Sequence, residues 1–412
     1  MNFIQKKIKP YIDENKPDYI LFLLASFLII VSMIFSYSLS IFTVDYYDYG
    51  QFHFFIRQLF VGTLAILIMW TMAHIKTDII FQKYNFGFWI FVVSFVLIIL
   101  MNFILPPSLV TASGGANRWI RLPGFSLAPV EFFKVGFIYF LSASFHKKFL
   151  HLNKVSFKEE VKLLIPYGVL FLFIVYLIAV KQKDLGQIVV LGTIIFIFLI
   201  FSNRSGKLFL SIIGIAIVGI AILIVSSSHR IRRIMGWWSS VQDDILVFLP
   251  DSIAQYLRVD NLPNYDQVSH SLNAIYNGGW FGLGLANGEL KLGFLSEVHT
   301  DFVLAGITEE IGLFGFFILI LVVFSIIYRI FKISKNVHNY TYHLFSLGIA
   351  LMITISFLIN SYGISGIIPI KGIAVPFLSY GGSAILAISI AMGMVLSISK
   401  DAYRDKRLLT KL

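Results

Sequence analysis

Ten apolar runs, each long enough to cross a lipid bilayer as a helix, decide which fold this chain can adopt. Hydrophobic residues make up 58% of the 412 residues and charged residues only 13%, which is well below the charged share of soluble domains. Because lipid offers no hydrogen-bond partners to the backbone, the sequence predicts an all-α polytopic membrane protein. The predicted spans are residues 18–40, 54–73, 86–106, 128–146, 161–180, 185–202, 207–226, 302–328, 342–360 and 380–399.

The distribution of basic residues predicts the side of the membrane on which each loop lies. An even number of spans places both termini on one side, and 21 of the 33 Lys and Arg residues lie in the tails or in loops on that side. The positive-inside rule therefore predicts that both termini are cytoplasmic. The same bias accounts for the net charge of +11 without a nucleic-acid partner. The absence of Cys excludes disulfides and thiolate chemistry.

The longest loop between spans, residues 227–301, is predicted to be extracytoplasmic, within a single transmembrane domain covering 1–412. Long loops on a membrane scaffold usually carry function. The first apolar run is too long for a signal peptide and lacks a cleavage site, so we expect a retained first span. No internal repeat and no interrupted helices in two halves are apparent, in contrast to many transporters.

Acidic residues where this loop meets the eighth span form the strongest candidate site. Asp301 follows His299 and Thr300 at the predicted boundary between water and lipid, and Glu309 and Glu310 lie within the span. Ionisable groups at membrane depth are costly and usually functional. Either Thr300 and Asp301 cap the helix, or Asp301 is a general base whose pKa is raised by partial burial. The two glutamates lie roughly 12 Å deeper, and one is expected to pair internally.

Basic side chains on the predicted outer face are candidates for binding an anion. The acids on that face nearly balance them, so they indicate local sites rather than a general field. Arg118 and Arg121 flank Trp119, and exposed arginines suit a pyrophosphate, whereas the tryptophan also suits simple anchoring at the interface. The outer cations are Arg118, Arg121, Lys181, Lys183, Arg230, Arg232, Arg233, Arg258, Lys291 and Lys371.

Charged and glycine residues near the outer face mark further motifs. Glu131 and Lys134, in the fourth span, have the spacing of an i,i+3 ion pair. The glycine-rich segment 278–284 suits either a flexible turn or a close approach of the backbone. It lacks the strand and helix context of a nucleotide-binding loop. Gly381 and Gly382 are expected to form a tight turn into the tenth span.

Together and in this order, these motifs resemble the SEDS family of membrane proteins (shape, elongation, division and sporulation). Each motif alone is weak, but the set is specific, and the resemblance covers roughly residues 18–400. The matching segments are Arg118-Trp119, Pro129-Val130-Glu131-Phe132-Phe133-Lys134, Asp184-Leu185-Gly186, the segment 271–285, Glu297-Val298-His299-Thr300-Asp301-Phe302, Glu309-Glu310-Ile311-Gly312, Lys371-Gly372 and Pro376-Phe377-Leu378-Ser379-Tyr380-Gly381-Gly382-Ser383.

Details of these motifs separate the chain from parts of the family. The Lys371-Gly372 pair, and the absence of Arg between Glu297 and His299, resemble the cell-division members more than the elongation members.

The chain also departs from the family's usual motifs. Val130 stands where Ser or Ala is usual, and Lys183 and Ser296 replace common prolines, although the neighbouring key side chains are kept. Asp243-Asp244 lacks the Pro that usually follows the arginines of the long loop.

The resemblance implies a peptidoglycan glycosyltransferase that polymerises lipid II into β-1,4-linked glycan at the outer face of the bacterial cytoplasmic membrane, at the division site. It implies Asp301 as general base, with Arg118, Lys134 and Arg233 stabilising the pyrophosphate. No cofactor is required by the sequence, a divalent cation is a further candidate, and its ligands are unassigned. The implied partners are a class B penicillin-binding transpeptidase and other division proteins. The implied substrate-binding residues are Arg118, Trp119, Glu131, Lys134, Asp184, Arg233, Glu297, His299, Lys371 and Ser379, with Glu309, Glu310, Gly381 and Gly382 as structural residues.

Other functions stay open at this point. A lipid II flippase would use the acids and the lysine of the spans, Glu131, Lys134, Glu309 and Glu310, as a polar path. A non-enzymatic scaffold would only recruit the transpeptidase. The concentration of polar motifs on one face of the membrane favours the enzyme.

Overall fold

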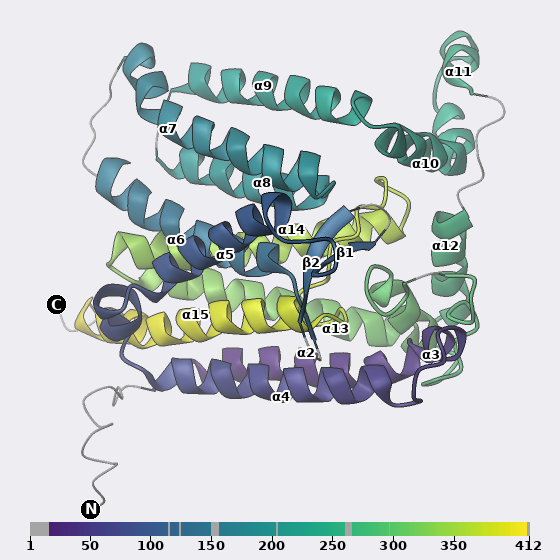
Figure 1. Cartoon of the computed structure of the whole chain (residues 1–412), viewed down its shortest axis with the longest axis horizontal. Helices are drawn as coiled ribbons and strands as arrows, with labels where there is room; N and C mark the ends of the chain where they lie inside the picture. The colour runs from purple at the N-terminus through teal and green to yellow at the C-terminus, as the bar shows by residue number, and fades with distance from the viewer. Residues whose placement is uncertain are drawn as a thin grey trace, which may run out of the picture.

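The computed structural model is a bundle of long helices, and it describes residues 16–113, 116–122, 125–149, 156–202, 205–259, 266–295 and 297–409 (Figure 1). In these ranges eight helical segments are long and apolar enough to cross a membrane. They are α2 (Tyr19–Ser38), α4 (His53–His74), α5 (Phe86–Phe103), α7 (Phe157–Val175) continued by η3 (Tyr176–Lys181), α9 (Gly206–Val225), α13 (Val303–Asn336), α14 (Tyr340–Ile364) and α15 (Gly382–Leu409).

Helices also form at the remaining predicted spans, the fourth and the sixth. The sixth is α8 (Leu185–Phe201), which is apolar but only 17 residues long. The fourth is α6 (Pro129–Phe149), which contains Glu131 and Lys134. The predicted fold class, a helical polytopic membrane protein, is confirmed, while the number of membrane crossings stays a prediction.

The start of the first span and the end of the last lie at the same end of the bundle. The Asp18 carboxylate accepts hydrogen bonds from Arg329 of α13, with N–O distances of 2.7–3.0 Å, and from the Tyr403 hydroxyl of α15 at 3.0 Å. The Asp18 amide donates to Ser399 at 3.0 Å. This arrangement agrees with the prediction that both termini share one side.

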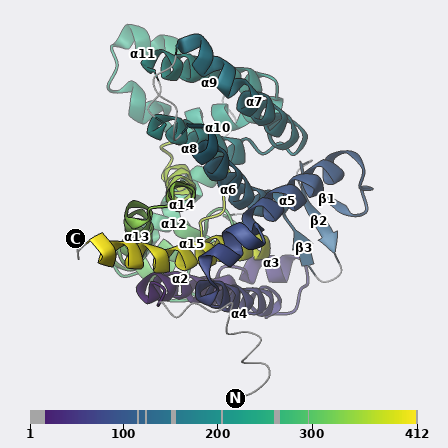
Figure 2. The same ribbon diagram turned by 90° about the vertical axis from the view of Figure 1, so that its left-hand side faces the viewer.

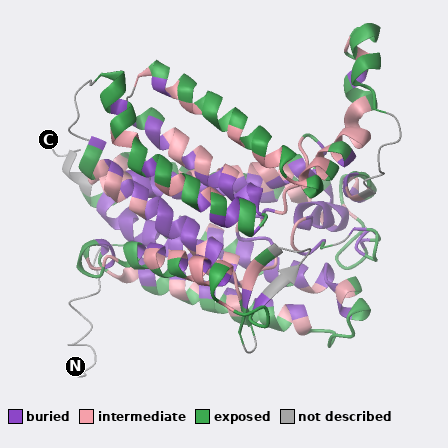
Figure 3. Ribbon diagram, turned by 45° about the horizontal axis from the view of Figure 1, so that its top comes forward, coloured by how far each residue is buried: buried purple, intermediate pink, exposed green. Residues whose placement is uncertain are grey.

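The bundle has a buried centre and an exposed layer of helices. Buried residues make up 72% of the apolar window of α15 and 67% of that of α14, but only 6% of that of α9. Figure 3 shows the buried residues gathered in the middle of the bundle. Figure 2 shows α7, α8 and α9 to one side of the layer formed by α13, α14 and α15, with α2 and α4 on the other side. The exposed apolar faces suit contact with lipid.

Shorter elements gather at the end of the bundle away from Asp18, and most were not predicted. They are α3 (Ile41–Tyr46), α10 (Ser228–Leu246), α11 (Asp251–Leu257), α12 (Asp266–Gly278) and the strands β1 (Val110–Ser113), β2 (Ala116–Leu122) and β3 (Phe125–Leu127). The strands form an antiparallel sheet in the order β1-β2-β3. A π-helix, η2 (Ile79–Lys83), lies in the loop between α4 and α5.

Helix α13 is broken at Gly312, which has φ 72° and ψ 177°. The break leaves carbonyls and amides of α13 without partners in the helix, and the glycine-rich segment 279–284 bonds to them. The bonds are Leu283 N to Glu309 O (3.0 Å), Gly284 N to Glu310 O (3.0 Å), Leu313 N to Gly279 O (2.9 Å) and Phe314 N to Trp280 O (3.1 Å). A Cβ at Gly282 would lie 2.2 Å from the Glu310 oxygen, so the close approach requires glycine. The close-approach interpretation of this segment is therefore favoured over the flexible turn.

Candidate functional site

Asp301 lies in a turn, residues 297–302, that leads into α13. The turn begins at Glu297, whose φ of 53° is unusual for a residue other than glycine. The amides of Thr300 and Asp301 donate to the Glu297 carbonyl at 3.0 and 3.1 Å. The Thr300 hydroxyl donates to the same carbonyl, and Phe302 is the N-cap of α13 without a side-chain bond. The expectation that Thr300 caps this helix is therefore wrong, and the start of α13 is held from outside.

The final loop between α14 and α15 holds the turn in place. The Ser379 hydroxyl donates to the Thr300 carbonyl at 2.7 Å, and the Tyr380 amide donates to the His299 carbonyl at 2.9 Å. Asn360, near the end of α14, donates to the carbonyl of Asp301 at 2.8 Å and to that of Ile373 at 2.9 Å. Ser379, predicted to bind substrate, thus acts on the backbone beside Asp301. Sequence reasoning missed Asn360, although a buried amide in an apolar span is itself a signal.

Lys371-Gly372 brings the final loop against the Asp301 carboxylate. Gly372 has φ 58°, and a Cβ on it would lie 2.9 Å from Asp301 Oδ2. The glycine therefore leaves room for the carboxylate. In the described part of the chain no hydrogen-bond donor contacts the side chain of Asp301, which is partly exposed. The acid is held by its backbone and keeps its oxygens free.

The surroundings of Asp301 weaken its acidity. Burial, followed by the negative charge of Glu297, raises the pKa of Asp301 to about 6. Arg118 and Arg233 act in the opposite direction, and Asp184 adds to the increase. The predicted site residues from three separate outer loops therefore lie near enough to influence one carboxylate. A base whose pKa lies near the operating pH is suited to proton transfer.

Arg118 joins the sheet to the loop before α8. It donates to the carbonyls of Gln182 at 3.3 Å and Lys183 at 3.0 Å, and its Nε lies 3.6 Å from Asp184 Oδ2. Burial raises the pKa of Asp184, and Arg118 opposes this change. The predicted residues Arg118 and Asp184 are thus neighbours.

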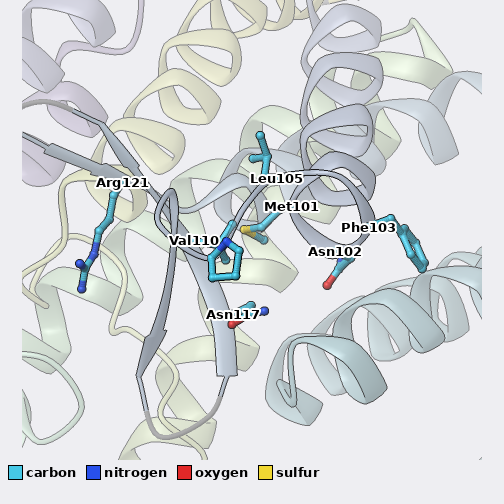
Figure 4. A pocket seen from close by; sticks show the side chains of 8 residues that line it. Met101, Asn102, Phe103, Leu105, Val110, Asn117 and Arg121 are labelled. Atoms are coloured by element: carbon cyan, nitrogen blue, oxygen red, sulfur yellow. The ribbon is translucent and has the colours of Figure 1, made fainter.

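Neighbouring residues of β2 face opposite sides of the sheet. Arg121 consequently points away from Arg118 and lines a cavity of about 320 Å³, together with Asn117, Met101 and Asn102 (Figure 4). Trp119 is paired with Thr111 across the sheet and is partly exposed.

Cations of α10 and of the final loop add positive charge to the same region. Burial, followed by the charges of Arg233 and Arg230, lowers the pKa of Lys371. Arg230 donates to the carbonyls of Leu223 and Ala179, and it is not among the main charges that affect the pKa of Asp301. Arg233 has a buried Nε that bonds to no described residue. The basic group available beside Asp301 therefore consists of Arg118, Arg233 and Lys371.

Glu131 and Lys134 form the predicted i,i+3 ion pair, with a distance of 2.9 Å between Lys134 Nζ and Glu131 Oε2. Gln187 of α8 donates to Glu131 at 3.2 Å. The pair borders a cavity of about 30 Å³ that Ser379 also lines, which is room for a single water molecule. Lys134 is buried and already paired, so it is a weaker candidate for a phosphate ligand than Arg118.

The acids within α13 are occupied by the preceding loop. Glu310 accepts a hydrogen bond from Lys291 Nζ at 2.6 Å, together with bonds from Ser38 and, at 3.1 Å, from the Ala286 amide. Glu309 accepts from the amides of residues 289 and 290 at 2.9 and 3.1 Å. These contacts agree with the structural role predicted for both glutamates.

Lys291 and Arg258 are among the outer cations that the sequence offers as candidates for an anion site, and that prediction is wrong for Lys291. Lys291 is buried against Glu310, and Arg258 pairs with Asp243 at 2.9 Å on the surface. Gly382 is the first residue of α15, and Gly381 accepts the amide of Ile385 in the turn before it, as expected for structural glycines.

His299 lies inside the site rather than on its surface. Its ring packs against Phe54 and Tyr380, with centroid distances of 5.0 and 5.4 Å, and its Nε2 lies 4.0 Å from Glu297 Oε2. Burial lowers the pKa of His299, which favours the neutral ring. Its buried Nδ1 bonds to no described residue. Aromatic packing is thus the main contact that fixes this side chain.

Comparison with known proteins places this arrangement in context. The family described as cell cycle protein, which groups FtsW, RodA and SpoVE, matches residues 18–404. A Helicobacter pylori protein named probable peptidoglycan glycosyltransferase FtsW is 47% identical over 381 residues, which are 92% of this chain and 97% of the relative. A Bacillus subtilis protein of the same name is 31% identical, over 96% of this chain and 92% of its own length.

Solved structures share the fold at lower identity. A chain from a peptidoglycan synthase complex, described by its coordination of polymerization and crosslinking, has a TM-score of 0.66 and 19% identity over 94% of this chain and 99% of its own. The Thermus thermophilus rod shape determining protein RodA has a TM-score of 0.62 and 18% identity over 94% and 98%.

Proposed function

The chain belongs to the family of cell cycle proteins that groups FtsW, RodA and SpoVE, and from this membership we propose that it is a peptidoglycan glycosyltransferase of the FtsW type. The predicted resemblance to the family, and to its cell-division branch, agrees with the names of these relatives. One observation carries the assignment of the base: Asp301 is partly exposed, has free oxygens and has a pKa raised to about 6.

The proposed reaction extends a β-1,4-linked glycan from lipid II. An acceptor sugar hydroxyl attacks the anomeric carbon of the donor while the bond from that carbon to the pyrophosphate oxygen breaks. Asp301 takes the hydroxyl proton, and undecaprenyl pyrophosphate leaves with the bonding electrons. A single displacement inverts the anomeric carbon, which converts an α-linked donor into a β-linked product.

Positive charge supports the departure of the pyrophosphate. Arg118 and Arg233 are the cations that lower the pKa of Asp301, and Arg233 also acts on Lys371, which precedes the glycine packed against the Asp301 carboxylate. Guanidinium groups pair with phosphate oxygens in a bidentate geometry, and charge placed in advance stabilises the transition state. We assign the pyrophosphate to this basic group. Lys134 is not included because it is paired with Glu131.

A divalent cation stays a proposal. Within the described residues no group of three His, Asp or Glu side chains is arranged to hold a metal ion. Mg²⁺ is commonly bound by one or two carboxylates together with substrate phosphates, and Asp184 beside Arg118 is the acid placed for that role. Polymerisation with and without a chelator tests this requirement.

The broken helix α13 gives little support to the flippase alternative. Discontinuous helices line transport paths in many carriers. Here the groups freed at Gly312 are bonded by residues 279–284, and Glu309 and Glu310 are bonded to the neighbouring loop. Because these groups are already hydrogen-bonded, the break is better suited to supporting Asp301 rigidly than to forming a polar path for transport.

Substitution of Asp301 tests the proposed base. Asp301→Asn keeps the size of the side chain but cannot accept the proton, so purified protein should lose at least about 100-fold of its rate of glycan polymerisation from lipid II. Asp244→Asn, a matched change at an exposed acid of α10, should leave the rate unchanged.

Each competing function gives a different result. Wild-type polymerisation by Asp301→Asn would refute the base. Translocation of lipid II by this inactive variant in vesicles would favour the flippase, and rescue of cell division by it would favour the scaffold.

The assembly and the location are further parts of the proposal. A solved neighbour comes from a peptidoglycan synthase complex, which supports a penicillin-binding transpeptidase as partner. The relatives named FtsW support action at the division site. Co-purification with the cognate transpeptidase and localisation of a fluorescent fusion test the two points.

A further inference from the structure

A continuous row of aromatic rings leads from the exposed first outer loop to the turn that holds Asp301. We call Tyr46, Tyr47, Tyr49, Phe54 and His299 the aromatic ladder. Successive ring centroids are 4.9, 6.0, 5.9 and 5.0 Å apart. The last ring belongs to the same turn as Asp301, so the ladder connects solvent with the candidate site.

Exposure falls steadily along the aromatic ladder. The exposed fractions of its residues from outside to inside are 69%, 61%, 45%, 9% and 5%. In the described part of the chain the hydroxyls of the three tyrosines make no hydrogen bond, and neither do the carboxylates of Asp45 and Asp48 beside them. The outer rungs therefore offer exposed ring surface together with free polar groups.

The ladder is fixed before any ligand arrives. Phe42 stacks on Tyr46 at 5.7 Å and packs against Gly293, where a Cβ would lie 2.8 Å from the phenylalanine ring. Tyr49 stacks on His53 at 4.5 Å with 9° between the rings. Rings held in this way lose little conformational entropy when they bind a ligand.

The chemistry of these groups suits a carbohydrate. The C–H face of a pyranose packs on the electron-rich face of an aromatic ring, and phenol and carboxylate groups accept or donate hydrogen bonds to sugar hydroxyls. Resting on the function proposed above, we propose that the aromatic ladder is a subsite for the glycan chain, outside the bond-forming site. The ladder binds the sugar chain, while the basic group binds the pyrophosphate.

Two features distinguish this ligand from a lipid surface. Tyrosines also gather at membrane interfaces, where they contact headgroups. Asp45 precedes Tyr46 and Asp48 separates Tyr47 from Tyr49, and the charge of these acids repels anionic headgroups and pyrophosphate alike. The row also continues inward to His299 instead of staying at one level of the surface. The uncharged sugar backbone of the glycan satisfies both features.

Binding of a soluble probe tests the subsite without requiring catalysis. The probe is a β-1,4-linked tetramer of N-acetylglucosamine, titrated into detergent-solubilised full-length protein and followed by calorimetry. Tyr46→Ala with Tyr47→Ala should weaken binding about tenfold through the loss of two stacking faces. Tyr256→Ala with Tyr276→Ala, at tyrosines that are 88% and 86% exposed elsewhere on the outer elements, should not weaken it.

Two further variants separate this proposal from the function on which it rests. Asp301→Asn should bind the tetramer like the wild type although it does not polymerise. Tyr46→Phe with Tyr47→Phe keeps the rings, so it should keep most of the affinity and controls for misfolding. With lipid II as substrate, the alanine pair should produce shorter glycan chains than the control pair.

Defined outcomes overturn the proposal. Equal affinity of the alanine pair and the control pair for the tetramer would refute the subsite. Loss of insertion into vesicles with unchanged tetramer binding would assign the tyrosines to the membrane interface and refute it as well. Polymerisation by Asp301→Asn would refute the assigned base but leave the binding result, and the subsite, standing.

Discussion

Substitution in the buried ion pair between Lys291 and Glu310 should destabilise the region that supports the site. The distance between Lys291 Nζ and Glu310 Oε1 is 2.6 Å, and the side chains are 1% and 0% exposed. Lys291 also donates to Ser38 of α2 at 3.1 Å. Lys291→Met would leave the Glu310 carboxylate buried without its counter-charge, and that unpaired charge is the source of the expected loss of stability.

The magnitude follows from burial. Removing one partner of a buried pair costs about 3–5 kcal/mol, whereas removing one partner of an exposed pair costs about 0–1 kcal/mol. Arg258→Met is the matched control, because its pair with Asp243 is also within direct contact at 2.9 Å but its side chains are 51% and 74% exposed. Lys291→Met with Glu310→Gln should recover most of the loss, since no unpaired charge then stays buried.

Reversible unfolding in mixed micelles, followed by tryptophan fluorescence, measures these free energies of unfolding. The polymerisation rate should fall in parallel, because the pair holds the loop that leads to Asp301. If Lys291→Met is no less stable than Arg258→Met, or if the double variant is as unstable as the single one, the argument from an unpaired buried charge is wrong.

Two further predictions concern the base and the broken helix. Because Asp301 acts when ionised and its pKa is about 6, the polymerisation rate should fall as the pH drops through about 6. Glu297→Gln removes a negative neighbour, so it should move the inflection of the rate–pH profile to lower pH. An unmoved inflection would contradict the assignment. Gly282→Ala places a Cβ 2.2 Å from the Glu310 carbonyl oxygen at a φ of 79°, so it should lower the free energy of unfolding by about 3 kcal/mol or more. Gly214→Ala on α9, whose Cβ meets no atom within 4 Å, should not lower it. Equal unfolding midpoints for the two variants would count against the required close approach.

The sequence predicts those features that depend on neighbours along the chain. The apolar runs give the spans because the length of a run and the thickness of a bilayer are compared directly. The pair of Glu131 and Lys134 follows from helical spacing alone. The motif around Asp301 marks the acid, although not how its turn is held.

Features that depend on distant segments were missed or misassigned. The sequence predicts Lys291 to be an exposed loop cation, but it is buried in a pair with Glu310, 19 residues along the chain. Thr300 has the residue type of a helix cap, yet the turn at Glu297 takes its hydroxyl. The break at Gly312 depends on residues 279–284, whose backbone replaces the lost helical bonds. The strands around Trp119 are too short for their alternation to stand out.

The interruption of α13 divides the outer region into two parts with different tolerance to change. Residues 279–284 are hydrogen-bonded to the backbone groups freed at the break, so a deletion or insertion there would displace the acid that follows. Upstream, α11 has no buried residue, whereas α10 carries Arg233 and is bonded to the final loop through Trp237 and the Gly366 carbonyl. The segment around α11 can therefore change in length and sequence to suit different partners, while α10 and the turn that holds Asp301 stay in place.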